Sequence, residues 1–103
     1  DQSFDAVIDI NAIQHNPIEK VPEILDEVKR VLKSGGMLFS IIIGNGTTNE
    51  SLFKKKGFIH FYKISEIKKI FKEFEIISIE KSDRTENNQK EKITHWMVTC
   101  RKR

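Results

Sequence analysis

The order of hydrophobic and polar positions along the chain predicts an α/β protein. Residues 4–10 carry apolar side chains at every second position, which is the period of a β-strand. Residues 21–32 repeat apolar side chains at helical spacing, and the sequence Asn-Pro-Ile-Glu at 16–19 has the form of a helix start. Gly35 and Gly36 then favour a tight reversal that ends this helix.

A second strand and a second helix are predicted in the middle of the chain. Residues 37–43 are almost continuously apolar, which is typical of a central strand that is covered on both faces. Residues 44–49 predict a loop, and residues 50–63, which mix aromatic side chains with lysines, predict an extended loop or an irregular helix. Ser65 is the expected cap of the second helix. The apolar side of that helix is expected to consist of Ile67, Ile70, Phe71 and Phe74.

The last part of the chain predicts two strands joined by a hairpin. The strands are expected at residues 75–80 and 93–101, with a polar loop at 82–91. Ile77 and Ile79 are expected on one face of the first of these strands. The predicted order is therefore strand, helix, strand, long loop, helix, strand, hairpin, strand.

Composition limits the class of protein. A chain of 103 residues with 38% hydrophobic content suits one small domain. The net charge is +3, and because the two signs are interspersed we interpret the lysines at 54–56 and the basic residues at 101–103 as solubilising. The single cysteine, Cys100, excludes an internal disulfide, and no motif predicts a metal site. The sequence has no stretch as long as a membrane span, so a cytoplasmic location is expected.

Two segments resemble class I S-adenosylmethionine-dependent methyltransferases. The sequence FDAVIDINAIQH at 4–15 resembles the family's fourth strand and the turn after it. The sequence VKRVLKSGGML at 28–38 resembles its helix-to-strand signature, with Ser34 where proline is common. The aromatic loop, the second helix and the final hairpin also fit. The resemblance implies a partial Rossmann-like sheet of about four strands and two main helices, ordered first, second, fourth, third, with the last strand antiparallel.

The family's glycine-rich loop and the acidic residue that ends its second strand have no counterpart in this sequence. The resemblance therefore implies that residues 1–103 are the C-terminal portion of a single methyltransferase domain. The expected parent function is methyl transfer from the cofactor S-adenosylmethionine to an unidentified acceptor, expected to be a small molecule. The 103-residue chain alone is expected to be inactive. With the neighbouring strand absent, residues 4–10 would form an apolar edge, so a homodimer or a segment-swapped oligomer is expected.

Doubly wound sheets bind ligands at the carboxyl ends of their strands. The resemblance accordingly implies cofactor contacts at Ile10, Asn11, Ala12 and His15. It implies substrate contacts at Gln14, Phe58, Phe61 and Tyr62. No catalytic residue is identified. Two alternatives remain open at this point: a non-enzymatic RNA-binding or protein-interaction module built on a methyltransferase-like half, and the tail of another doubly wound enzyme such as a nicotinamide-dependent dehydrogenase.

Overall fold

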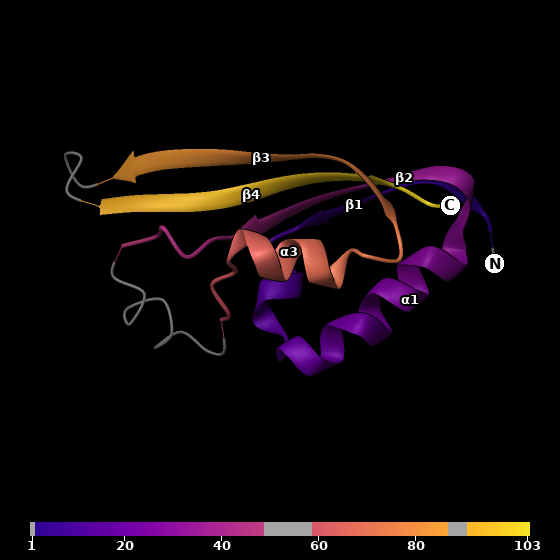
Figure 1. Ribbon diagram of the computed structural model, residues 1–103, viewed down its shortest axis with the longest axis horizontal. Helices are drawn as coiled ribbons and strands as arrows, with labels where there is room; N and C mark the ends of the chain where they lie inside the picture. Colours follow the sequence, from indigo (N-terminus) through magenta and orange to yellow (C-terminus); the bar gives the residue numbers. More distant parts are fainter. Residues whose placement is uncertain (1, 49–58, 87–90) are drawn as a thin grey trace.

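The computed structural model describes residues 2–48, 59–86 and 91–103. It consists of one mixed sheet with both α-helices on the same side (Figure 1). In chain order the elements are β1 (Phe4–Ile10), two 3-10 turns (Ile13–His15 and Ile18–Lys20), α1 (Val21–Val31), β2 (Leu32–Ile43), α3 (Ile64–Ile70), β3 (Glu75–Glu86) and β4 (Glu91–Arg101).

The sheet has four strands in the order β1-β2-β4-β3. β1 and β2 are parallel, and β4 is antiparallel to both of its neighbours, β2 and β3. This is the predicted strand order. It places β4, the last strand along the chain, between two strands that precede it. The sheet is therefore completed only when β4 pairs on both of its sides.

The core lies between the sheet and the two helices. Leu38, Ile42 and Val98 supply the sheet side of this core and are at most 2% exposed. The opposite face of the sheet is open within the described ranges: Ile8 is 70% exposed, and Phe39 is 41% exposed. The prediction that residues 37–43 are covered on both faces was therefore wrong for the described part of the chain, because α1 and α3 pack on one face alone.

Helix α1 begins at Val21 and has Lys20 as its N-cap, four residues after Asn16, the cap that the sequence pattern predicted. Pro22 explains the difference, because proline is tolerated only in the first turn of a helix. The 3-10 turn at Ile18–Lys20 precedes it, and neither that turn nor α1 has a side-chain cap. The amide of Asn16 instead donates to the carbonyl oxygen of Ala12, at 3.0 Å.

Helix α3 is capped two residues earlier than predicted. Its N-cap is Lys63, not Ser65, and the Lys63 N–H donates to Glu66 Oε1 at 2.9 Å. The four predicted apolar side chains pack in the core as expected, but α3 ends at Ile70, so Phe71 is its C-cap and Phe74 lies beyond the helix. Ile67, Phe71 and Phe74 are at most 2% exposed, and Ile70 packs against the same core.

Irregular strands account for three further differences. The glycine pair does not follow α1 directly but lies within the first residues of β2, where Gly35 has a φ of +79° and the register against β1 shifts. In β3 the register shifts between Ile76 and Ser78, so Ile77 is 45% exposed and does not share a face with Ile79. The predicted loop at 82–91 was also too long, because β3 continues to Glu86 and β4 begins at Glu91.

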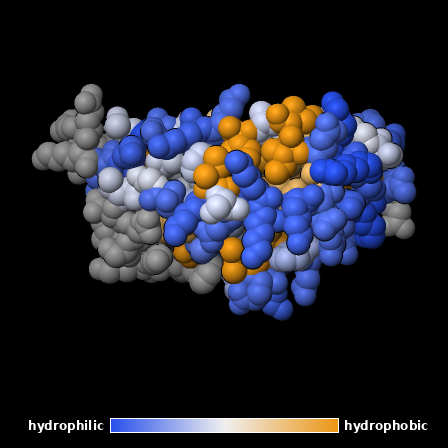
Figure 2. All heavy atoms as spheres, viewed as in Figure 1, coloured by the Kyte–Doolittle hydropathy of each residue, from blue (hydrophilic) through white to orange (hydrophobic). Residues whose placement is uncertain are grey.

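The surface differs between the two layers. Figure 2 shows a largely hydrophilic helical side, with a small apolar area between the helices and a larger one along the sheet. The small area corresponds to a groove of about 480 Å³ between α1 and α3. Its apolar lining is Ile18, Pro22, Leu25, Ile70 and Phe74. None of the helices in the described ranges is both long and apolar enough to span a membrane.

Candidate functional site

The candidate site lies where the parallel strands β1 and β2 end. Their carboxyl ends meet at one edge of the sheet, beside the N-terminal end of α3 (Figure 1). The chain returns to this edge after the undescribed segment. Tyr62 forms a bridge with Gly44, and its N–H donates to the carbonyl oxygen of Ile43 at 3.1 Å. Three segments, one after β1, one after β2 and one before α3, thus converge where α/β sheets bind ligands.

Asn11 has the most unusual environment at this edge. Its φ is +57°, in the left-handed region that asparagine tolerates better than most residues, and its N–H donates to the carbonyl oxygen of Ile41 at 2.8 Å. Its side-chain oxygen, Oδ1, is buried and has no hydrogen-bond partner among the residues that the structure describes. A buried acceptor of this kind costs about 1–3 kcal/mol when it stays unpaired. Backbone strain and an open acceptor therefore coincide at one predicted cofactor contact.

Asp9 and Ser40 fix the turn that follows β1. The Ser40 hydroxyl donates to Asp9 Oδ2 at 2.7 Å, and the backbone of Ala12 also hydrogen-bonds the carboxylate. Burial raises the pKa of Asp9 above its usual value, although both hydrogen bonds oppose this change. Asp9 was not predicted from the sequence as a site residue. A carboxylate on the same face of the strand as the partly buried Val7 was the signal that could have found it.

Gln14 joins the three segments. It is 5% exposed, its Oε1 accepts the N–H of Ile43, and its backbone oxygen accepts the N–H of His60 at 2.8 Å. Its side-chain oxygen is thus already paired within the fold. The other predicted cofactor contacts after β1 are more exposed. Ile10 is 61% exposed, and Ala12 and His15 are exposed as well.

The predicted substrate residues differ in position. Phe61 is 7% exposed and belongs to a small apolar cluster with Ile43, Ile59 and Ile93. Tyr62 is fully buried, and within the described ranges its hydroxyl has no hydrogen-bond partner. Burial, followed by the nearby Glu66 carboxylate, raises the pKa of Tyr62 to about 12, so this hydroxyl stays protonated at neutral pH. Phe58 lies outside the described residues.

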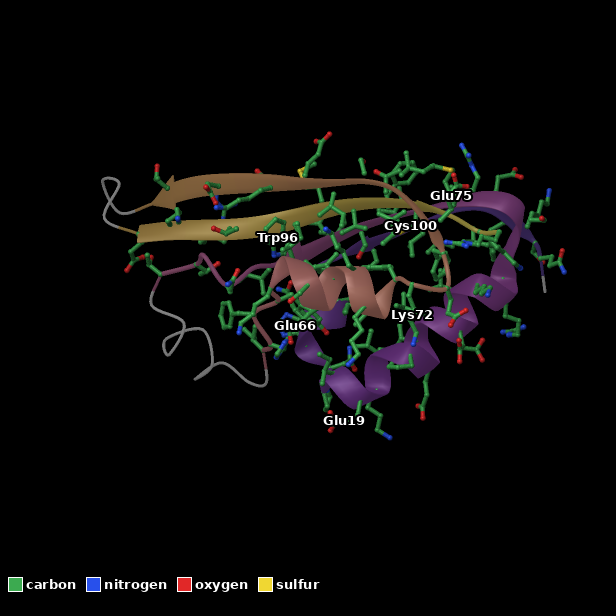
Figure 3. The ribbon with its side chains drawn as sticks, in the orientation of Figure 1. Glu19, Glu66, Lys72, Glu75, Trp96 and Cys100 are labelled. Atoms are coloured by element: carbon green, nitrogen blue, oxygen red, sulfur yellow. The ribbon has the colours of Figure 1, made fainter. Side chains whose placement is uncertain are left out.

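Trp96 holds Tyr62 in place from the sheet. Its indole Nε1–H donates to the carbonyl oxygen of Tyr62 at 2.8 Å. In Figure 3, Trp96 extends from β4 toward the N-terminal end of α3, and Glu66 lies at the same end of that helix. The loop before α3 is therefore fixed by a side chain from the last strand of the sheet.

His60 and Glu66 form a pair that the sequence analysis did not anticipate. His60 Nε2 lies 2.9 Å from Glu66 Oε2, and the two side chains are 31% and 28% exposed. The His60 ring also packs edge-on against Tyr62, with ring centres 4.5 Å apart. Burial raises the pKa of Glu66, but hydrogen bonds from the Lys63 N–H and from His60 outweigh it and hold this pKa below its usual value. Glu66 is therefore ionised at neutral pH.

The space around Gly44, at the end of β2, is filled by side chains of β4. A Cβ at this position would lie 2.8 Å from Trp96 Nε1 and 3.1 Å from Thr94 Cγ2. We expect Gly44→Ala to displace the indole from the Tyr62 carbonyl and to lower the free energy of unfolding by about 1–3 kcal/mol. Urea denaturation measures this change.

A double-mutant cycle with Trp96→Phe supplies the control. If the added methyl acts through the indole, Gly44→Ala should cost less in the Trp96→Phe background than in the wild type. Fully additive costs would show that the methyl group acts elsewhere.

Comparison with known proteins identifies the fold. Residues 1–40 match the sequence model of a methyltransferase domain. A comparison with curated proteins gives no match. Among solved structures, an S-adenosylmethionine-dependent methyltransferase from Methanosarcina mazei superposes with a TM-score of 0.77 at 19% identity, over 99% of this chain and 60% of that one.

Two further enzymes superpose in the same way. For 1,6-didemethyltoxoflavin-N1-methyltransferase from Burkholderia thailandensis the TM-score is 0.76 at 14% identity, over 98% of this chain and 44% of that one. For magnesium protoporphyrin IX methyltransferase from Synechocystis it is 0.67 at 15% identity, over 100% and 47%. The chain thus spans 44–60% of the length of these three proteins. The residues that the structure describes, with four strands and two α-helices, form part of the Rossmann-like fold seen in class I S-adenosylmethionine-dependent methyltransferases.

Proposed function

We propose that this chain is the C-terminal half of an S-adenosylmethionine-dependent methyltransferase domain that methylates a small molecule. The observation that carries the proposal is Asn11, a strained residue with an unpaired buried acceptor at the carboxyl edge of two parallel strands. The likeness to methyltransferases solved with bound S-adenosylhomocysteine supports it, and one of these carries the small molecule 1,6-didemethyltoxoflavin.

The residues after β1 fit the edge of such a cofactor. Asn11 Oδ1 can accept a hydrogen bond from an N–H or O–H group, and the exposed Ile10 and Ala12 can form a wall beside it. We propose that the exposed His15, in the turn that follows β1, also contacts the cofactor. S-adenosylmethionine supplies an electrophilic methyl group, so the main task of the protein is to align the acceptor with that methyl. Phe58, Phe61, Gln14 and Tyr62 remain the proposed substrate side.

The proposal includes a cytoplasmic location and self-association of the isolated chain as a homodimer or a segment-swapped oligomer. The support for self-association is structural. β1 is an edge strand of the described sheet, and Phe4, Ile8 and Ile10 are 54%, 70% and 61% exposed. Edges and apolar faces of this kind favour pairing with another chain.

Calorimetric titration with S-adenosylhomocysteine tests the proposed function. We expect no saturable binding to the 103-residue chain at millimolar ligand, because the glycine-rich loop and ribose-binding acid that the family uses are absent from this sequence. We expect binding in the micromolar range when the chain is produced together with the half that carries those elements. Micromolar binding by the 103-residue chain alone would contradict the half-domain proposal. Absence of binding and of methyl transfer by the intact protein would overturn the methyltransferase proposal itself.

A further inference from the structure

The carboxylate of Glu66 is held at both of its oxygens. Oε1 accepts the N–H of Lys63 at the start of α3, at 2.9 Å, and Oε2 contacts His60 Nε2, also at 2.9 Å. Rotation of the carboxylate away from His60 would also break its hydrogen bond to the N–H of the N-cap residue Lys63. The first turn of α3 thus fixes the position of the group that His60 contacts.

This contact determines which nitrogen of His60 carries the proton. An ionised carboxylate only accepts hydrogen bonds, so in the neutral imidazole Nε2 is the protonated nitrogen and Nδ1 carries the lone pair. No hydrogen bond joins Nδ1 to the residues that the structure describes, and the His60 side chain is 31% exposed. The Tyr62 ring and the bond from the His60 N–H to Gln14 restrict the orientation of the residue further. Nδ1 is thus an oriented proton acceptor on a partly exposed side chain.

His60 also lies at the edge where methyl transfer would occur. The His60 N–H donates a hydrogen bond to the carbonyl oxygen of Gln14, three residues after Asn11. The Tyr62 N–H donates to the carbonyl oxygen of Ile43, at the end of β2. We propose that His60 accepts the proton of a hydroxyl-bearing methyl acceptor through Nδ1, with Glu66 as its positioning residue. This inference rests on the proposed methyltransferase function.

The proposed step balances in atoms and charge. The hydroxyl oxygen of the acceptor forms a bond to the methyl carbon while the carbon–sulfur bond breaks and its electron pair passes to sulfur. The hydroxyl proton passes to Nδ1. The positive charge of the sulfonium is thereby replaced by that of the imidazolium, which the Glu66 carboxylate stabilises at 2.9 Å.

The tautomer is measurable in the 103-residue chain without cofactor. In ¹⁵N-detected correlation spectra of the neutral side chain we expect the Nε2–H form of His60 to predominate, with His95→Gln and His15→Gln used for assignment. Glu66→Gln keeps an oxygen for the Lys63 N–H and places an amide NH2, which is a donor, opposite His60 Nε2, so we expect it to shift His60 toward the Nδ1–H form. A predominant Nδ1–H form in the wild type, or a spectrum unaffected by Glu66→Gln, would overturn the pairing.

The chemical role is tested in the intact methyltransferase at pH 8 with two probe acceptors. Phenol is largely un-ionised at this pH and needs a base, whereas the nitro group of 4-nitrophenol leaves it largely ionised. We expect His60→Gln to lower kcat for phenol about 100-fold, within the range of general-base catalysis, and kcat for 4-nitrophenol less than about threefold. His95→Gln, a substitution on β4, should leave both rates unchanged.

Binding of S-adenosylhomocysteine distinguishes failure of the proposed His60 role from failure of the proposed methyltransferase function. If the wild type binds this ligand and methylates phenol, but His60→Gln slows both probes equally or neither, the proton-acceptor role is overturned while the methyltransferase proposal stands. If the wild type neither binds the ligand nor transfers a methyl group, the proposed function fails first and the role of His60 fails with it.

Discussion

Asn11→Phe, made in the intact protein that we propose to be a methyltransferase, is expected to weaken binding of S-adenosylhomocysteine by at least tenfold, equivalent to about 1.4 kcal/mol. The large ring would occupy the place beside β1 where we position the cofactor, and it would remove the unpaired Oδ1 acceptor. Because Asn11 has a φ of +57°, a phenylalanine there is also strained, so a decrease in melting temperature of a few degrees is expected. Calorimetry and thermal denaturation measure the two effects.

Asn11→Gly is the matched variant because glycine tolerates a positive φ without strain. It removes the unpaired acceptor without adding bulk, so we expect the protein to be as stable as the wild type or more so, while cofactor affinity falls. Opposite signs for stability and affinity would identify Oδ1 as a ligand-binding atom. Unchanged affinity in both variants would show that the cofactor does not contact Asn11.

The 103-residue chain is expected to sediment as a dimer or larger oligomer at 100 μM, and Ile8→Lys is expected to shift it toward the monomer. The side chain of Ile8 is 70% exposed on the open face of the edge strand, so a charge there would remain in water in the monomer and lose hydration in an assembly. Glu19→Lys is the control, because Glu19 lies on the helical side, far from the sheet in Figure 3. A stable, folded wild-type monomer at this concentration would contradict the proposed self-association.

Strong periodicity was sufficient to predict the elements that form the covered face. The strand at Phe4–Ile10 has the predicted bounds, although its alternating apolar side chains are exposed and Val7, on the other face, packs against the core. The apolar side chains expected along the second helix are buried, because there the packing follows the helical period. The outer part of the hairpin was missed. Residues such as Asp83 and Thr94 pair across it through backbone and side chains, with no alternation of apolar and polar positions to indicate a strand. The bulge before Ser78 likewise leaves no mark in the hydrophobic pattern.

The sequence predicted the location of the candidate site, at the carboxyl ends of the parallel strands, but not the side-chain contacts within it. The rule for parallel strands located Asn11 correctly at the carboxyl end of β1. Two side-chain pairs stabilise this edge. Asp9 and Ser40 are 31 residues apart in the chain, so their contact depends on how β1 and β2 pair. His60 and Glu66 meet only because Lys63, and not the predicted Ser65, caps α3. Such pairs depend on register and on rotamers, which hydrophobic periodicity does not encode.

The position of β4 between β2 and β3 has a consequence for biosynthesis. While the ribosome has not yet released residues 91–101, β2 has β1 as its only neighbour, β3 has none, and the indole that fixes Tyr62 is missing. The two strands that β4 joins are thus exposed together as unpaired edges in the nascent chain, and the pairing of β4 with β2, which is distant in sequence, forms more slowly than the β3–β4 hairpin. The period between emergence of β3 and emergence of β4 is therefore the stage at which a chaperone would protect this domain most.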